Sequence, residues 1–139
     1  MKREDISPDD ALQILKEGNQ RFLQNKLINT DLPKQVKQTA EGQFPFAAIL
    51  GRVDSRTASE LIFNIGIGEL INVRVAGNIV NEDILGSLEY ACTVANTRLI
   101  VVLGHTRCGA IESACDQLEL GNITSLLKKI RPAIEAETN

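Results

Sequence analysis

The chain has 139 residues, of which 43% are hydrophobic and 24% are charged, and its formal net charge is −3. This length and composition are typical of one domain that can bury a hydrophobic core. The acidic balance, without a concentrated stripe of lysine and arginine, argues against a nucleic acid as the main partner. We therefore expect a single domain over residues 1–139 that does not bind DNA or RNA.

The N-terminus and the cysteines bear on the cellular compartment. Polar and acidic residues follow Met1, where a secretory signal would carry an apolar stretch. No apolar run approaches the length that crosses a membrane. The three cysteines, an odd number without a paired framework, fit a reducing compartment better than a disulfide scaffold. These features predict a cytosolic protein that has no membrane partner.

A helix is expected close to the N-terminus. Ser7 can cap it, Pro8 suits its first turn, and the acidic Asp9 favours the positive end of the helix dipole. Ala11 and Leu15 then begin an apolar stripe at helical spacing. Such a stripe must pack on another surface of the protein.

The next segment, residues 25–43, is polar and has few apolar anchors. It reads as a connection with a short helix over residues 33–41. We expect residues 1–43 to form an N-terminal helical arm and residues 44–139 to form the α/β core.

Three apolar runs that end in glycine predict the strands of this core, at residues 44–51, 70–77 and 99–104. Helical patterns lie between and after them, at residues 58–66, 81–96, 109–119 and from residue 122 onward. Strands that alternate with helices imply parallel pairing through right-handed crossovers. The expected fold class is α/β, an open and mostly parallel β-sheet flanked by helices on both faces.

Polar residues follow each expected strand, at residues 52–56, at Asn78 and at residues 105–108. The carboxyl ends of parallel strands share one edge of a sheet, and ligands gather beyond that edge. We therefore expect these three polar clusters to converge.

His105 and Cys108 are the residues in these clusters that could bind a metal. An imidazole nitrogen and a thiolate sulfur suit Zn²⁺, and the start of the next helix, expected at Cys108, would favour the thiolate. His-x-x-Cys alone is a weak signal, so a structural origin of the pair stays open.

Asp54 and Arg56 are close enough in sequence for their side chains to pair. A bidentate arginine orients a carboxylate and keeps it ionised, so that it can orient water or accept a proton from it. The alternative is a salt bridge that only ties down a loop. Arg74, near the end of the second expected strand, could serve an anion or stay solvated.

Several blocks, in this order along the chain, resemble the β-class carbonic anhydrases: DSR at residues 54–56, ELIF at 60–63, VRVAGN at 73–78, SLEY at 87–90 and VLGHTRCG at 102–109. The resemblance implies a zinc enzyme that hydrates carbon dioxide to bicarbonate and a proton. It also implies a parallel α/β sheet and a homodimer or higher homo-oligomer.

In that family two cysteines and one histidine hold the zinc, and the resemblance matches His105 and Cys108 with two of these ligands. It matches Asp54 and Arg56 with an aspartate-arginine dyad, whose aspartate either assists the zinc-bound water or ligates the zinc itself. The remaining ligand should be a cysteine at the position of Arg52. A guanidinium is always protonated and cannot coordinate a metal. We therefore expect zinc affinity to fall and the family reaction to be impaired or lost.

A second departure concerns the C-terminus. The family normally continues with a further strand beside the third one, whereas this sequence stops at Asn139, so we expect a C-terminally short core. The apolar edge at residues 99–103 would then be exposed, which is a hazard unless another chain covers it. Self-association could supply that cover.

Three hypotheses follow from these departures. In the first, Asp54, His105 and Cys108 hold a catalytic zinc while Arg52 swings aside. In the second, the protein is a non-catalytic anion-binding or scaffold relative in which Arg52 pairs with Asp54 or the Cys108 thiolate. The arginines of that site, Arg52, Arg56 and Arg107, would then suit bicarbonate or another small anion. In the third, the sequence is an altered version of an ordinary active enzyme.

Overall fold

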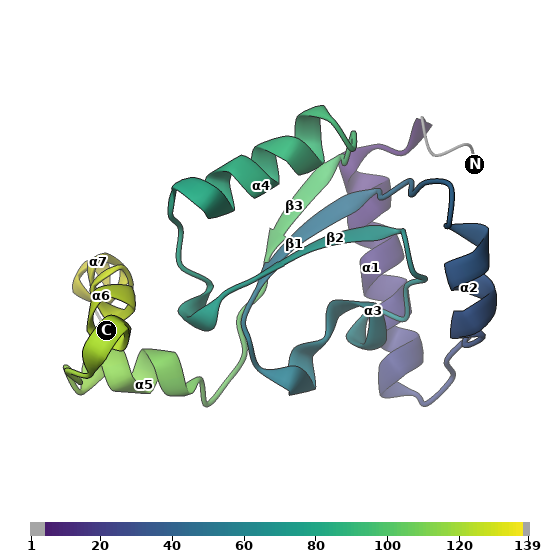
Figure 1. The fold of residues 1–139 in the computed structure, drawn as a ribbon. Coiled ribbons are helices and arrows are strands. Elements are labelled where there is room, and N and C mark those ends of the chain that lie inside the picture. The colour runs from purple at the N-terminus through teal and green to yellow at the C-terminus, as the bar shows by residue number, and fades with distance from the viewer. Residues whose placement is uncertain (1–4, 138–139) are drawn as a thin grey trace.

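In the computed structural model, which describes residues 5–137, three parallel strands form one sheet in the order β2-β1-β3 (Figure 1). The strands are β1 (Ala47–Gly51), β2 (Leu70–Arg74) and β3 (Leu99–Val102). Ala47 pairs with Leu70 on one side and with Leu99 on the other, so β1 lies at the centre. The predicted open parallel sheet is confirmed.

Helices precede, connect and follow the strands, as the sequence pattern predicts. They are α1 (Pro8–Leu23), α2 (Leu32–Gln38), α3 (Ser59–Ile62), α4 (Glu82–Thr93), α5 (Gly109–Cys115), α6 (Gly121–Lys128) and α7 (Arg131–Ala136), with short 3-10 turns at Ser55–Thr57 and Ala76–Asn78. Within residues 5–137, no helix is both long enough and apolar enough to cross a membrane.

Helix α1 covers one face of the sheet (Figure 1). Ser7 caps it and Pro8 occupies the first turn, as the sequence predicts, and the cap is a reciprocal capping box with Asp10. The buried Ala11 and Leu15 pack in one cluster with strand residues such as Ile49. The apolar stripe of α1 is thereby removed from water.

Helix α4 covers the opposite face. Its buried side chains Leu88 and Ala91 pack against Ala48 and Leu50 of β1. Because consecutive residues of a strand point to opposite faces, β1 is buried along its whole length between α1 and α4. This central burial explains why β1 reads as an uninterrupted apolar run.

Strand β3 lies at the edge of this sheet, and part of it is exposed. Ile100 and Val102 pair with Ala48 and Leu50 in register, so they share the α4 face. However, α4 packs over β1 and β2, and it leaves Ile100 42% and Val102 63% exposed. The predicted exposed apolar edge is therefore present in the described chain.

Several predicted elements are shorter than expected, and two of them show why. The second strand ends at Arg74 instead of residue 77, because its partner β1 ends at Gly51 and Gly77 turns the chain with a φ of 68°. The helix predicted over residues 58–66 ends at Ile62, since Asn64 adopts a left-handed conformation. Local periodicity does not reveal either limit.

Candidate functional site

The polar clusters that follow the three strands converge, as the sequence predicts. Arg52 follows β1, Asn78 ends the 3-10 turn after β2, and His105 follows β3. Hydrogen bonds join all three loops, so the carboxyl edge of the sheet is one polar site.

Arg52 lies at the centre of this site. Its Nε donates a 3.0 Å hydrogen bond to Oδ1 of Asn78, and its Nη1 donates a 3.1 Å bond to the carbonyl oxygen of His105. Nδ2 of Asn78 in turn donates to the carbonyl oxygen of Leu103, at 3.4 Å. In the described chain, Arg52 therefore pairs with neither Asp54 nor Cys108, and the pairing that the second hypothesis gave it is wrong.

Arg74 supports the same site from β2. Its Nε donates to the carbonyl oxygen of Arg52 at 2.8 Å, and its Nη2 donates to the carbonyl oxygen of Asp54 at 2.6 Å. Arg74 is exposed, so its charge is open to solvent, one of the two roles that the sequence left open. The guanidinium of Arg74 holds the main chain of the loop after β1.

Asp54 and Arg56 form the predicted pair. Nε and Nη2 of Arg56 lie 2.9 Å and 2.5 Å from the two carboxylate oxygens, and the main-chain N–H of Arg56 also donates to Oδ1, at 2.9 Å. The side-chain hydrogen bond from Arg56, followed by its main-chain bond, holds the pKa of Asp54 far below its usual range. The Asp54 hydrogen bond likewise raises the pKa of Arg56. The carboxylate is thus ionised and fixed in orientation.

His105 lies just after β3 and Cys108 lies at the start of α5, the places in the fold that the sequence predicts for them. Nδ1 of His105 lies 2.8 Å from the carbonyl oxygen of Thr106, which can only accept a hydrogen bond, so Nδ1 carries a proton. Nε2 faces Asp54, with 3.8 Å between Nε2 and Oδ2. Cys108 is buried at the N-cap of α5.

A zinc ion would need at least three protein ligands here, and these side chains do not supply them. Among residues 5–137, no group of three or more His, Cys, Asp and Glu side chains is arranged to hold a metal ion. Both oxygens of Asp54 accept hydrogen bonds from Arg56. The position at which the resemblance implies a zinc-ligand cysteine carries the cationic Arg52. The arrangement of residues 52–108 does not fit zinc.

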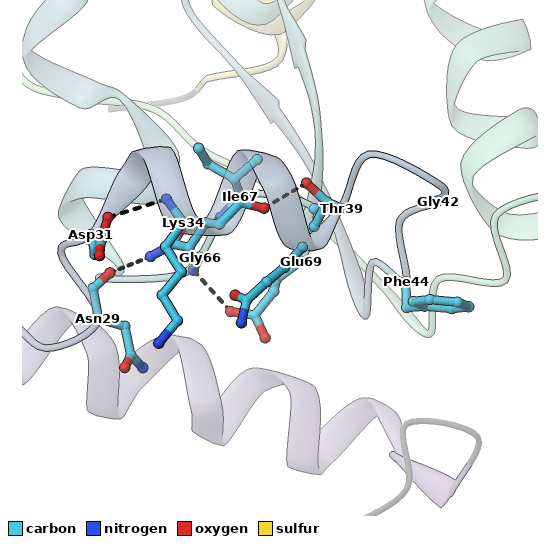
Figure 2. A pocket seen from close by; sticks show the side chains of 12 residues that line it. Asn29, Asp31, Lys34, Thr39, Gly42, Phe44, Gly66, Ile67 and Glu69 are labelled. Carbon is cyan, nitrogen blue, oxygen red and sulfur yellow. Dashed lines mark hydrogen bonds between the residues drawn. The ribbon is translucent and has the colours of Figure 1, made fainter.

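A separate pocket of about 520 Å³ lies at the other end of the sheet, between α2 and residues 66–69 (Figure 2). Gln35 joins its two sides, because its Oε1 accepts a hydrogen bond from the N–H of Ile67. Phe44 and Glu69, which line it, precede β1 and β2. The pocket is therefore remote from the carboxyl edge that holds His105.

Sequence reasoning missed how Asn78 and Gly104 serve the site. Asn78 has a φ of 40°, a conformation that asparagine tolerates better than most residues. In the sequence, only its polar side chain directly after Gly77 pointed to a role at the strand end. Gly104 leaves space for Arg52, since a Cβ there would lie 3.2 Å from Nη2. From the sequence, Gly104 indicated only the end of a strand.

Comparisons with known proteins agree with this fold. The family model described as carbonic anhydrase matches residues 47–139. Carbonic anhydrase 2 of Mycobacterium tuberculosis is 38% identical over 140 residues, which cover 92% of this chain and 65% of that protein. A carbonic anhydrase of Mycolicibacterium smegmatis is 36% identical over 135 residues, with the same two coverages. The chain thus spans 65% of the length of these curated relatives.

Solved structures give the same result. The β-carbonic anhydrase CcaA has a TM-score of 0.68 and 28% sequence identity, covering 89% of this chain and 64% of that one. The β-carbonic anhydrase CafA of Aspergillus fumigatus has a TM-score of 0.69 and 25% identity, covering 91% and 60%. By sequence, family model and fold, this chain belongs to the β-class carbonic anhydrase family.

Proposed function

We propose that this chain is a carbonic anhydrase family member in which zinc-dependent hydration of carbon dioxide is impaired or lost. The observation that carries the proposal is the hydrogen-bonded guanidinium of Arg52 at the position of a zinc-ligand cysteine. A guanidinium stays protonated at every physiological pH, so it offers no lone pair and repels a divalent cation.

The remaining candidate ligands do not compensate for this exchange. His105 and Cys108 supply two donors of the types that zinc prefers, and Asp54 could supply a third. To do so, Asp54 would have to leave its bidentate partner Arg56 and overcome the repulsion from Arg52. This competition predicts weak zinc binding and little zinc-bound water.

The test compares the wild-type chain with Arg52→Cys, and uses Val53→Cys as the matched control because Val53 is an exposed neighbour. Each protein is purified, its zinc content is measured by mass spectrometry, and carbon dioxide hydration is followed by stopped flow. We expect hydration at background for the wild type and for Val53→Cys, and bound zinc in Arg52→Cys. Hydration by wild type at a rate typical of enzymes would contradict the proposal.

The second candidate function is binding of bicarbonate or another small anion, as a non-catalytic module. It is favoured by the charge at the carboxyl edge, where Arg52, Arg56 and Arg107 accompany the carboxylate of Asp54. Titration with bicarbonate, followed by NMR shifts of the arginine Nε–H groups, tests this function. Saturable shifts that Arg107→Ala weakens would support it, and no saturable shift would exclude it.

We further propose that residues 1–139 act as one domain that self-associates in the cytosol. The exposed side chains of Ile100 and Val102 support self-association, since burying apolar edge residues stabilises an interface. The free thiols of Cys92, Cys108 and Cys115 suit a reducing compartment.

A further inference from the structure

The three strand-end loops are linked by a single side chain. Arg52 extends from the loop after β1 to Asn78 in the turn after β2 and to the main chain of His105 after β3. Its two hydrogen bonds leave from different nitrogens of the planar fork, which fixes the orientation of the guanidinium as well as its position.

The base of the same side chain is also held. Arg74 donates to the carbonyl oxygens of Arg52 and Asp54, so two hydrogen bonds tie the loop that carries Arg52 to β2. We name Arg52, Arg74 and Asn78, with the carbonyl groups they bind, the strand-end clasp. In the clasp every link is a hydrogen bond between a charged or amide donor and an oxygen acceptor.

The surrounding backbone accommodates this clasp. Asn78 adopts a φ of 40°, and from there its Oδ1 accepts a hydrogen bond from Arg52 while its Nδ2 donates to the carbonyl oxygen of Leu103. Gly104 has no Cβ, and one placed there would approach Nη2 of Arg52 to 3.2 Å. Both positions therefore accommodate the guanidinium of Arg52.

From this geometry we infer that the strand-end clasp holds the carboxyl edge of the sheet without a metal, with Arg52 providing the cross-link that joins the three loops. The inference uses the site of the proposed function, but it concerns what holds the loops together and does not depend on whether carbon dioxide is hydrated. Its consequence is that the stability of the wild-type chain is independent of zinc and depends on Arg52.

A double-mutant cycle tests the cross-link. The variants are Arg52→Ala, Asn78→Gly and the double variant, and glycine is chosen at position 78 because it keeps the positive φ without strain. Each unfolding equilibrium constant is measured by urea denaturation. We expect Asn78→Gly to raise the constant roughly tenfold in the wild-type background and by much less in the Arg52→Ala background.

Arg107→Ala is the matched control, because Arg107 is an exposed arginine of the same site without a hydrogen bond in the described chain. We expect it to leave the unfolding constant nearly unchanged and to be additive with Asn78→Gly. Equal effects of Asn78→Gly in both backgrounds of the Arg52 cycle would overturn the inference. If the Ala variant does not fold, Arg52→Lys, which keeps the charge and loses the fork, replaces it.

The second arm measures metal dependence. Thermal unfolding of the wild-type chain is recorded with EDTA and with added zinc chloride, and hydrogen exchange is measured at residues 103–106. We expect unchanged midpoints and exchange in both solutions, and faster exchange in Arg52→Lys alone. A midpoint that EDTA lowers in the wild type would overturn the inference. Hydration activity is a separate readout, so a wild type that hydrates carbon dioxide while keeping the coupling would contradict only the proposed function.

Discussion

Gly104 lies against the guanidinium of Arg52, and a Cβ on Gly104 would stand 3.2 Å from Nη2. That separation is below ordinary van der Waals contact, so an alanine would press on a side chain whose Nε and Nη1 are already bound to Asn78 and to the His105 carbonyl. A free side chain could retreat without cost, whereas a bound guanidinium can move only by lengthening its hydrogen bonds.

Gly104→Ala is therefore expected to destabilise the wild-type chain by roughly 1 kcal/mol. In the Arg52→Ala background the same change should be neutral or slightly stabilising, because alanine lowers the entropy of the unfolded chain. Chemical denaturation of the four proteins in this cycle measures both effects. Equal destabilisation in the two backgrounds would show that Arg52 does not set the constraint at Gly104.

Gly18, in α1, should be the least replaceable of the described glycines. A Cβ on it would lie only 1.7 Å from the carbonyl oxygen of Phe63, a main-chain atom that cannot yield without moving α3 away from α1. We expect Gly18→Ala to lower the free energy of unfolding by about 3 kcal/mol or more. Gly86→Ala is the control, since nothing lies near that position in α4 and alanine should stabilise the helix by about 0.5–1 kcal/mol. A thermal shift assay separates these opposite signs.

The capping box of α1 should give the stability a pH dependence. Side-chain and main-chain hydrogen bonds from Ser7 lower the pKa of Asp10 from its usual 3.8. A carboxyl whose pKa is lower in the folded state stabilises that state above the unfolded pKa, and this stabilisation is lost as pH falls through the folded pKa. The stability difference between wild type and Asp10→Ala should be constant above about pH 5 and shrink below about pH 4. Urea denaturation across this range would refute the assignment if the difference grew on acidification.

Val102→Lys should weaken self-association. The valine side chain is 63% exposed on the uncovered part of the sheet face, and a lysine there would place charge in any interface formed by β3. Sedimentation velocity should show the wild type as a dimer or larger and the variant shifted toward the monomer. Leu23→Lys, at an equally exposed leucine of α1, controls for the added charge and should sediment as wild type. If Val102→Lys also sediments like the wild type, the β3 edge is not the interface.

The strands and the start of α1 could be predicted because their signals are local. An apolar run closed by glycine marks β1, and the Ser7–Asp10 box marks the first turn of α1. The end of β2 at Arg74 could not be predicted, because a parallel strand ends where its partner ends and that partner is β1.

The hydrogen-bond partners of Arg52 could not be predicted from the sequence, for a related reason. Cys108 and Asp54 were the obvious anionic groups, but Asp54 is taken by the nearer Arg56. The acceptors that Arg52 does use are an amide and a main-chain carbonyl, and a carbonyl exists at every residue, so no residue type reveals which one is close. Only the folded arrangement of the three loops identifies it.

If Arg52 replaces a zinc ligand and excludes the metal, the zinc content of the purified chain shows it most directly. Wild type and Arg52→Cys are loaded with zinc, desalted and measured by mass spectrometry, and each is repeated with Cys108→Ser to assign the zinc to this site. We expect almost no zinc in the wild type and about one zinc per chain in Arg52→Cys, lost with Cys108→Ser. About one zinc per wild-type chain, lost with Cys108→Ser, would contradict it.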